Sequence, residues 1–338
     1  MRSSKFGLVL LCLALVFLSC GKGSKPEDYG VSISAPKHLG TPSERFSADQ
    51  VQLLRITNSL SFHLLNQIYT STDTIFPFSY STLGFLQNLY TLTDTTYQRV
   101  LEQHYSISDS QAFVQNISDL LSLVSDIDST IKESTQVQPS KTSPYSDLVQ
   151  ELQIPFPYEG MLNPIQSNFT LMDSSQRQMN FYEISSRFGF FRSETELCLD
   201  IPVGNENYSL MILEPMDKDI KTFAQTFTES KYKEIVEKLS YQVLRISLPE
   251  LKQSTIFSLH FPTINNHTPH ERKSCLLTTR VSFLMPTRAM LEHEETDIDT
   301  KLRSNTKTEH HILSRPFLYI LRSKNTNTIL HLGIFLGT

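Results

Sequence analysis

The chain has 338 residues, of which 39% are hydrophobic and 19% charged, and its formal net charge is −5 at pH 7. This is the composition of an ordinary globular protein, and the length suits one large domain or two small ones. The mild acidity excludes the strongly basic surface that nucleic-acid-binding proteins use, so we expect no nucleic-acid partner.

The N-terminus predicts a secretion signal. Arg2 and Lys5 precede an apolar run, Phe6–Leu18. The run has signal-peptide length and is too short to span a bilayer comfortably. The run ends at Leu18-Ser19-Cys20, which resembles the lipobox of bacterial lipoproteins. That resemblance implies a signal peptide over 1–19 and a lipid on Cys20, with acyl chains such as palmitate. The alternative is a plain secretory signal followed by a chance cysteine.

The lipobox also implies a place in the bacterial cell envelope. The protein would be anchored in the outer membrane and face the periplasm or the cell surface. Residues 20–45 are rich in Gly, Lys, Ser and Pro and predict the lipid anchor and a flexible tether. Cys198 and Cys275 remain in the mature chain, where they either pair or stay as two buried thiols.

The first half of the chain has a helical pattern. Apolar residues recur at helical spacing over Ser47–Tyr69, and shorter patterns predict further helices. The expected elements are a buried segment at Ile75–Ser79, helices at Leu83–Tyr90, after Asp94 and at Phe113–Val124, and a loop over 132–144.

The second half changes to strand patterns from about residue 168. It holds one helix, Phe223–Leu239, with a start signal at Thr228-Glu229. The predicted strands include Phe169–Leu171, Leu197–Pro202, Tyr208–Leu213, Val243–Leu251, Ile256–Phe261, Val281–Leu284, Ala289–Leu291, Phe317–Leu321 and Ile329–Phe335. Helices followed by strands indicate an α+β protein built around a large antiparallel sheet.

Three pairs of segments in the second half resemble the serpins, the protease-inhibitor superfamily. The pairs are Asp200–Gly204 with Tyr208–Pro215, Phe227–Leu239 with Val243–Lys252, and Ser314–Ile320 with Thr328–Gly333. In the first half, Asn58–Tyr69 and Ile75–Thr96 look like the first serpin helix and the segment after it.

The resemblance implies a serpin-like domain over 46–338. N-terminal helices would pack on a large mixed or antiparallel sheet, with a smaller, barrel-like C-terminal sheet. The region from about 105 to 165 departs from the family, because it is abridged by tens of residues and lacks the expected strand motif. This puts in doubt the helix that overlies the main sheet in serpins.

Serpins inhibit by a change of fold, in which a protease cleaves an exposed loop that then inserts into the main sheet as a new strand. Here the loop would cover about 294–314. By resemblance its hinge includes Glu295, Asp297, Ile298, Thr300 and Leu302. The side chains alternate. One set would face inward, namely Ile298, Thr300, Leu302 and Ser304, and the other outward, namely Asp297, Asp299, Lys301 and Arg303.

The candidates for the cleaved position are Arg303, Asn305, Lys307 and His311. The expected partners are serine proteases, with cysteine proteases as a second class, together with the membrane through the N-terminal lipid. We expect a monomer that is not an enzyme, with no catalytic residue, cofactor or metal. The alternative function is a non-inhibitory binding or structural lipoprotein with the serpin fold, which the missing hinge glycine and alanines favour.

Overall fold

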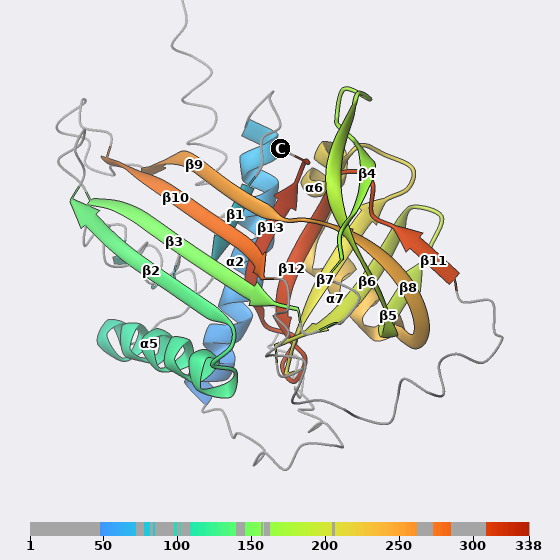
Figure 1. The fold of residues 1–338 in the computed structure, drawn as a ribbon. Helices are drawn as coiled ribbons and strands as arrows, with labels where there is room; N and C mark the ends of the chain where they lie inside the picture. The colour runs from blue at the N-terminus through green and yellow to red at the C-terminus, as the bar shows by residue number, and fades with distance from the viewer. Residues whose placement is uncertain are drawn as a thin grey trace, which may run out of the picture.

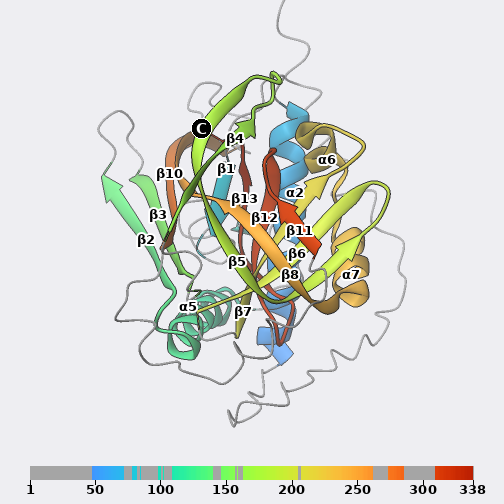
Figure 2. The ribbon, with the colours of Figure 1, turned by 45° about the vertical axis from the view of Figure 1, so that its right-hand side comes forward.

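The computed structural model describes residues 48–71, 78–81, 84, 98–99, 102, 109–139, 146–156, 158, 163–204, 207–261, 273–284 and 309–337. Two β-sheets dominate this part of the chain, one of nine strands and one of four. Figure 1 shows the four-stranded sheet on the left and the nine-stranded sheet on the right, and Figure 2 keeps the same arrangement after a turn of the molecule.

The nine-stranded sheet has the order β1-β13-β12-β7-β6-β5-β8-β11, with β4 paired to β5 beside this path. Its first and last strands, β1 and β11, do not pair with each other in the described residues, so the sheet is open rather than a closed barrel. Its strands are β1 (Phe78–Ser81), β4 (Ile165–Thr170), β5 (Gln176–Arg192), β6 (Glu196–Val203), β7 (Tyr208–Pro215), β8 (Ser240–Pro249), β11 (Glu309–Ile312), β12 (Phe317–Ser323) and β13 (Ile329–Phe335).

The central strands of this sheet are buried on both faces. Every residue of β6, β7 and β13 is buried, and so is every residue of β12 except the last. Their near-continuous apolar sequences fit this position, and the strands predicted over Leu197–Pro202, Tyr208–Leu213, Phe317–Leu321 and Ile329–Phe335 are confirmed.

The four-stranded sheet has the order β2-β3-β10-β9. Its strands are β2 (Lys132–Pro139), β3 (Ser146–Pro155), β9 (Lys252–Phe261) and β10 (Lys273–Leu284). β2 with β3 and β10 with β9 are antiparallel pairs, whereas β3 and β10 run parallel. This sheet draws two strands from the middle of the chain and two from the second half.

The loop predicted over 132–144 is wrong for most of its length, because β2 occupies Lys132–Pro139. The strand was missed because β2 carries polar side chains on both faces, so it lacks the alternation that marks a half-buried strand. Only residues 140–145 separate β2 from β3, whose first pair is Pro139 with Ser146.

The helices lie against the nine-stranded sheet and one another. They are α2 (Ala48–Ser71), α5 (Ser110–Ile127), α6 (Ile220–Thr226) and α7 (Glu229–Lys238). α2 packs on β13, α5, α6 and α7, and it buries Leu53, Leu60 and Leu65. The helices predicted over Ser47–Tyr69 and Phe113–Val124 are confirmed.

The single helix predicted over Phe223–Leu239 is two helices. α6 ends at Thr226, and the extended Thr228 begins α7 by accepting a hydrogen bond from the Lys231 N–H. The predicted start at Thr228-Glu229 is therefore confirmed. The helix starts there because the threonine side chain caps it and pairs with a backbone N–H that the helix itself leaves unpaired.

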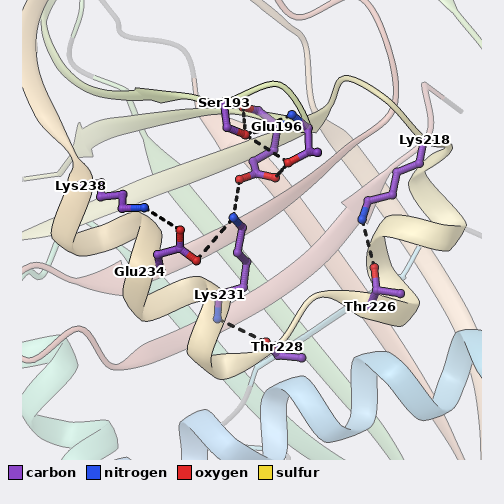
Figure 3. A network of polar contacts seen from close by, with 9 residues as sticks. Ser193, Glu196, Lys218, Thr226, Thr228, Lys231, Glu234 and Lys238 are labelled. Carbon is purple, nitrogen blue, oxygen red and sulfur yellow. Dashed lines mark hydrogen bonds and ion pairs between the residues drawn. The ribbon is translucent and has the colours of Figure 1, made fainter.

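A network of charged groups joins α7 to the turn between β5 and β6 (Figure 3). Lys231 Nζ lies 2.8 Å from Glu196 Oε1 and 3.5 Å from Glu234 Oε2. Burial raises the pKa of Glu196, but hydrogen bonds from Lys231, Thr195 and Ser193 outweigh it and hold the pKa below its usual value. The pairing of these charges fixes the helix on the sheet.

Cys198 is a buried free thiol. Cys198 lies in β6, is not exposed and makes no disulfide. Of the two alternatives for the cysteines, the buried thiol is therefore the one that Cys198 adopts. In the described residues no helix has both the length and the apolar composition needed to cross a bilayer.

Candidate functional site

The candidate site is the seam between β3 and β10, the parallel pair of the four-stranded sheet. The register runs from Leu277 opposite Leu148 to Leu284 opposite Pro155. β10 ends at Leu284, at the end of the seam where Leu284 lies opposite Pro155. The next described strand along the chain is β11, which belongs to the other sheet (Figure 1). The segment 285–308, which holds most of the predicted reactive loop, therefore begins at one end of this seam.

The inner face of the seam changes from apolar to polar along the strands. At the end of the seam near Leu284, the first inner pair is Ile154 with Phe283 and the second is Leu152 with Val281. All four side chains are buried. The next inner row is polar across the whole sheet and consists of Thr135, Gln150, Thr279 and Thr255. Gln150 and Thr279 are 2% and 1% exposed, so this polar row lies inside the protein.

The polar groups at the seam are unevenly satisfied. Gln150 Oε1 accepts a hydrogen bond of 3.0 Å from the Ser81 N–H, which links β3 to β1. The Thr279 hydroxyl and the Gln253 Oε1 have no hydrogen-bond partner among the described residues. An unpaired buried polar group costs about 1–3 kcal/mol, so the polar row is a weak point of the closed sheet.

An acid lies beside the polar row. Glu133 is the inward neighbour of Leu152 in β2, and its Oε1 accepts a hydrogen bond from the Ser81 hydroxyl. Burial raises the pKa of Glu133 and the hydrogen bond from the Ser81 hydroxyl lowers it by a smaller amount, so the pKa lies at about 7. The carboxyl group therefore titrates near neutral pH.

The outer face of the seam carries an ion pair. Arg280 and Glu151 are direct neighbours across β3 and β10, and Arg280 Nη1 lies 2.6 Å from Glu151 Oε1. The rest of this face in the described strands is mainly polar, with residues such as Lys132, Gln153, Ser282 and Lys252. A polar face of this kind can be exposed to water.

β11 is the strand to which the chain returns after 285–308. It pairs in parallel with β8, from Glu309 opposite Leu244 to Ile312 opposite Ser247. On the outer side, His310 Nε2 lies 2.9 Å from the Ser247 hydroxyl and 3.9 Å from Glu183 Oε2. These contacts hold the far end of the segment on the nine-stranded sheet.

Most of the predicted site residues lie outside the described residues. This applies to Cys20, to the hinge residues Glu295, Asp297, Ile298, Thr300 and Leu302, and to the cleavage candidates Arg303, Asn305 and Lys307. Their roles stay predictions.

The remaining candidate, His311, is described. It lies in β11 opposite Ile246, is 9% exposed and packs its ring against Phe190 with 5.0 Å between the centroids. Burial lowers the pKa of His311. Cleavage next to His311 would therefore require β11 to leave β8.

The seam residues Gln150, Thr279 and Glu133 do not stand out in the sequence as candidates for a site. A signal for β3 was present, because Leu148, Leu152 and Ile154 alternate with more polar residues. No comparable signal marked Thr279 or Glu133, because a buried polar residue inside a strand looks like a solvent-facing one until the strand's neighbours are known.

Comparisons with known proteins support the fold. No family model and no curated protein matches the chain. Among solved structures, the 1.45 Å structure of SRPN18 from Anopheles gambiae, a serpin, is similar with a TM-score of 0.63 and 10% sequence identity. The match covers 84% of this chain and 99% of that chain. The resemblance read from the sequence is thus confirmed at the level of architecture, and the chain has the serpin fold.

Proposed function

We propose that this protein inhibits a serine-type protease as a suicide substrate, with the segment between β10 and β11 as the bait. The observation that carries the proposal is the parallel pairing of β3 and β10 in a sheet whose other pairs are antiparallel. The segment with the predicted hinge starts where this pair ends, at Leu284 and Pro155.

Strand direction explains why this geometry favours insertion. A chain that leaves the end of β10 and turns back runs antiparallel to β10, and so also antiparallel to β3. Placed between the two strands, it would replace one parallel pair by two antiparallel pairs. Antiparallel pairing is slightly more stable per residue, and the number of paired strand edges rises.

The sequence after Glu295 is compatible with such a strand. Its inward set, Ile298, Thr300, Leu302 and Ser304, has no charge, whereas burial of an isolated charge would be costly. The inner face of the seam offers both apolar neighbours, Leu152 and Val281, and polar ones, Gln150 and Thr279. A strand with alternating aliphatic and hydroxyl side chains suits both.

Protease capture depends on whether strand insertion is faster than hydrolysis of the ester that joins the protease to the cut loop. The serine of the protease attacks the carbonyl carbon at the cleaved position, the amine of the next residue leaves, and an ester joins protease and inhibitor. If the freed strand inserts before water hydrolyses this ester, the protease is carried away from the loop and remains bound.

The test is incubation with trypsin-like, elastase-like and subtilisin-like proteases, followed by denaturing electrophoresis. We expect a covalent complex with at least one of them. Leu302→Glu, with a charge on the inward side, should turn the inhibitor into a substrate that is cut without complex formation. Lys301→Glu, on the outward side, should keep the complex. Cleavage of the wild type without any complex would overturn the proposal and support the non-inhibitory binding function.

We also propose that Cys20 is lipidated and anchors the protein in the bacterial envelope, as its lipobox-like context indicates. One acyl chain binds a membrane only marginally, whereas two or three hold a protein firmly. Mass spectrometry of the N-terminal peptide should find an acylated cysteine, and Cys20→Ser should release the protein from the membrane fraction. An unmodified Cys20 would contradict this.

A further inference from the structure

β4 is an edge strand of the nine-stranded sheet. It pairs with β5 and with no other described strand, and its hairpin with β5 projects at the upper end of the sheet in Figures 1 and 2. Proteins usually protect such an edge with charged residues, prolines or a bulge. β4 has none of these, because Ile165–Thr170 contains no charged residue and no proline and pairs with β5 in one unbroken register.

The hydrogen bonds of β4 identify its free backbone groups. The Thr170 N–H donates to Ser314 O at 2.7 Å, so it points away from β5. Backbone groups of alternate residues point to the same side of a strand in an antiparallel pair, so those of Gln166 and Asn168 also point away from β5. Both residues are exposed, and their N–H and C=O groups have no partner in the described part of the chain.

We propose that two copies of this chain associate by antiparallel pairing of β4 with β4, about a two-fold axis at Ser167. In this register Gln166 of one copy lies opposite Asn168 of the other. Such a pair exchanges both of its backbone hydrogen bonds, so every free N–H and C=O of the two residues gains a partner. The chain that the sequence predicts to be a monomer would then be half of a symmetric dimer, in which both copies use the same surface. The inference does not depend on protease inhibition.

The two neighbouring registers satisfy fewer of these groups. An axis at Gln166 would place Asn168 opposite Pro164, which has no N–H to donate. An axis at Asn168 would place Gln166 opposite Thr170, whose N–H already has an acceptor. Each of these registers leaves a backbone carbonyl without a donor, so the axis at Ser167 is the one that pairs both residues completely.

The side chains of β4 also favour this pairing. Gln166 and Asn168, which would be neighbours across the axis, are uncharged amides that can both donate and accept hydrogen bonds. Ile165, on the other face of the strand, is 53% exposed and would lie against the partner strand, which removes apolar surface from water. Because β4 carries no charge, the two strands meet without local repulsion, although each chain has a net charge of −5.

The test is sedimentation equilibrium of the full chain over a range of concentrations, for the wild type, Ser167→Lys, Ser167→Asp and an equal mixture of these two variants. We expect the wild type to form dimers. Each variant alone should self-associate at least about tenfold more weakly, because like charges meet at the axis, and the mixture should regain the dimer. Ser185→Lys changes an exposed serine of β5 and is the matched control, which should leave the association unchanged.

Hydrogen exchange of the wild type gives a second readout. In the dimer the backbone amides of Gln166 and Asn168 gain acceptors, so their exchange should slow as the protein concentration rises. The Thr170 amide already donates to Ser314, and its exchange should not depend on concentration. This measurement needs no substitution, so it tests the proposal even if a Ser167 variant fails to fold.

Each of the other outcomes would contradict the proposal. A wild type that stays monomeric at every concentration would overturn it and leave the edge to a strand of another protein. A dimer that both Ser167 variants retain, or Gln166 and Asn168 amides that exchange equally fast in the dimer, would mean that β4 is not the interface. A mixture that does not regain the dimer would overturn the register, because the axis at Ser167 is what brings the two substituted side chains together.

Discussion

Asp200 and Arg322 form a buried, bidentate ion pair inside the nine-stranded sheet. Arg322 Nε donates to Asp200 Oδ1 at 3.0 Å and Arg322 Nη2 donates to Asp200 Oδ2 at 2.6 Å. The residues are 0% and 3% exposed, respectively. Burial lowers the pKa of Arg322, but the charge of Asp200 and its hydrogen bonds outweigh this and raise the pKa overall.

Removing one partner of this pair should be costly. Asp200→Asn keeps the shape of the side chain but leaves Arg322 as a buried charge without a counter-ion, so we expect a loss of about 3–5 kcal/mol in the free energy of unfolding. Urea denaturation followed by circular dichroism measures this. The double variant Asp200→Leu with Arg322→Met should lose less. A single variant as stable as the wild type would show that the pair is not needed.

Glu133 should make the stability of the protein depend on pH. Its pKa in the folded state is about 7, above the usual 4.5. A carboxyl group with a raised folded pKa contributes stability below about pH 4.5, and this contribution is lost as the pH rises through 7. Each unit of the shift corresponds to about 1.36 kcal/mol, so the loss is at most about 3.4 kcal/mol.

The measurement is the free energy of unfolding between pH 5 and 8 for the wild type and Glu133→Gln. The difference between the two proteins should change across this range and level off above it. His331, whose pKa burial lowers to about 3, adds a slope of opposite sign in both proteins, which cancels in the difference. A difference that does not vary with pH would contradict the assignment.

The helices and strands that could be predicted from the sequence are those with a clear periodicity or a high apolar content. The first helix, the strands Leu197–Pro202 and Ile329–Phe335, and the start of α7 at Thr228 could all be read from it. β2 could not, because its inward residues Glu133 and Thr135 are polar. The parallel pairing of β3 with β10 could not either, since strand direction and register arise from contacts between segments far apart in the chain.

The ion pair between β3 and β10 can be used to test whether these two strands separate when the loop is cut. In the uncut protein Arg280 and Glu151 lie opposite each other in β10 and β3, and their side chains are exposed. A double-mutant cycle with Arg280→Gln and Glu151→Gln should give a coupling energy of about 0.2–1 kcal/mol that high salt weakens. Strand insertion would separate the two backbones by two strand spacings, about 9–10 Å.

The same cycle in the loop-cut protein should therefore give a coupling near zero. Unfolding by guanidinium chloride would itself screen the pair, so thermal unfolding at low salt is the suitable measurement. An undiminished coupling after cleavage would mean that β3 and β10 remain neighbours and that the strand has not entered between them.

The turn between β12 and β13 connects elements from both halves of the chain. Asn327, which joins β12 to β13 with a φ of 56°, offers its carbonyl oxygen to Asn58 of α2 at 3.2 Å and to the Tyr232 hydroxyl of α7 at 2.9 Å. Its side chain accepts from Arg322 Nη1 at 2.5 Å. The turn thus links the buried ion pair, the C-terminal strands and the first helix, and holds α2 in place on the sheet.

Asn58 is the residue through which the first helix joins this turn. Its Nδ2 donates to Asn327 and its Oδ1 accepts from the Ile329 N–H at 2.8 Å. Asn58→Ala removes both bonds and leaves part-buried backbone groups unpaired, so we expect a loss of about 1–3 kcal/mol in the free energy of unfolding. Ser59→Ala, on the exposed side of the same helix, should change it by at most about 0.5 kcal/mol. Hydrogen exchange adds a local readout, because the Ile329 amide should lose protection in Asn58→Ala before the rest of β13 does. Equal effects of the two variants, or unchanged protection at Ile329, would mean that packing alone holds α2 against the C-terminal strands.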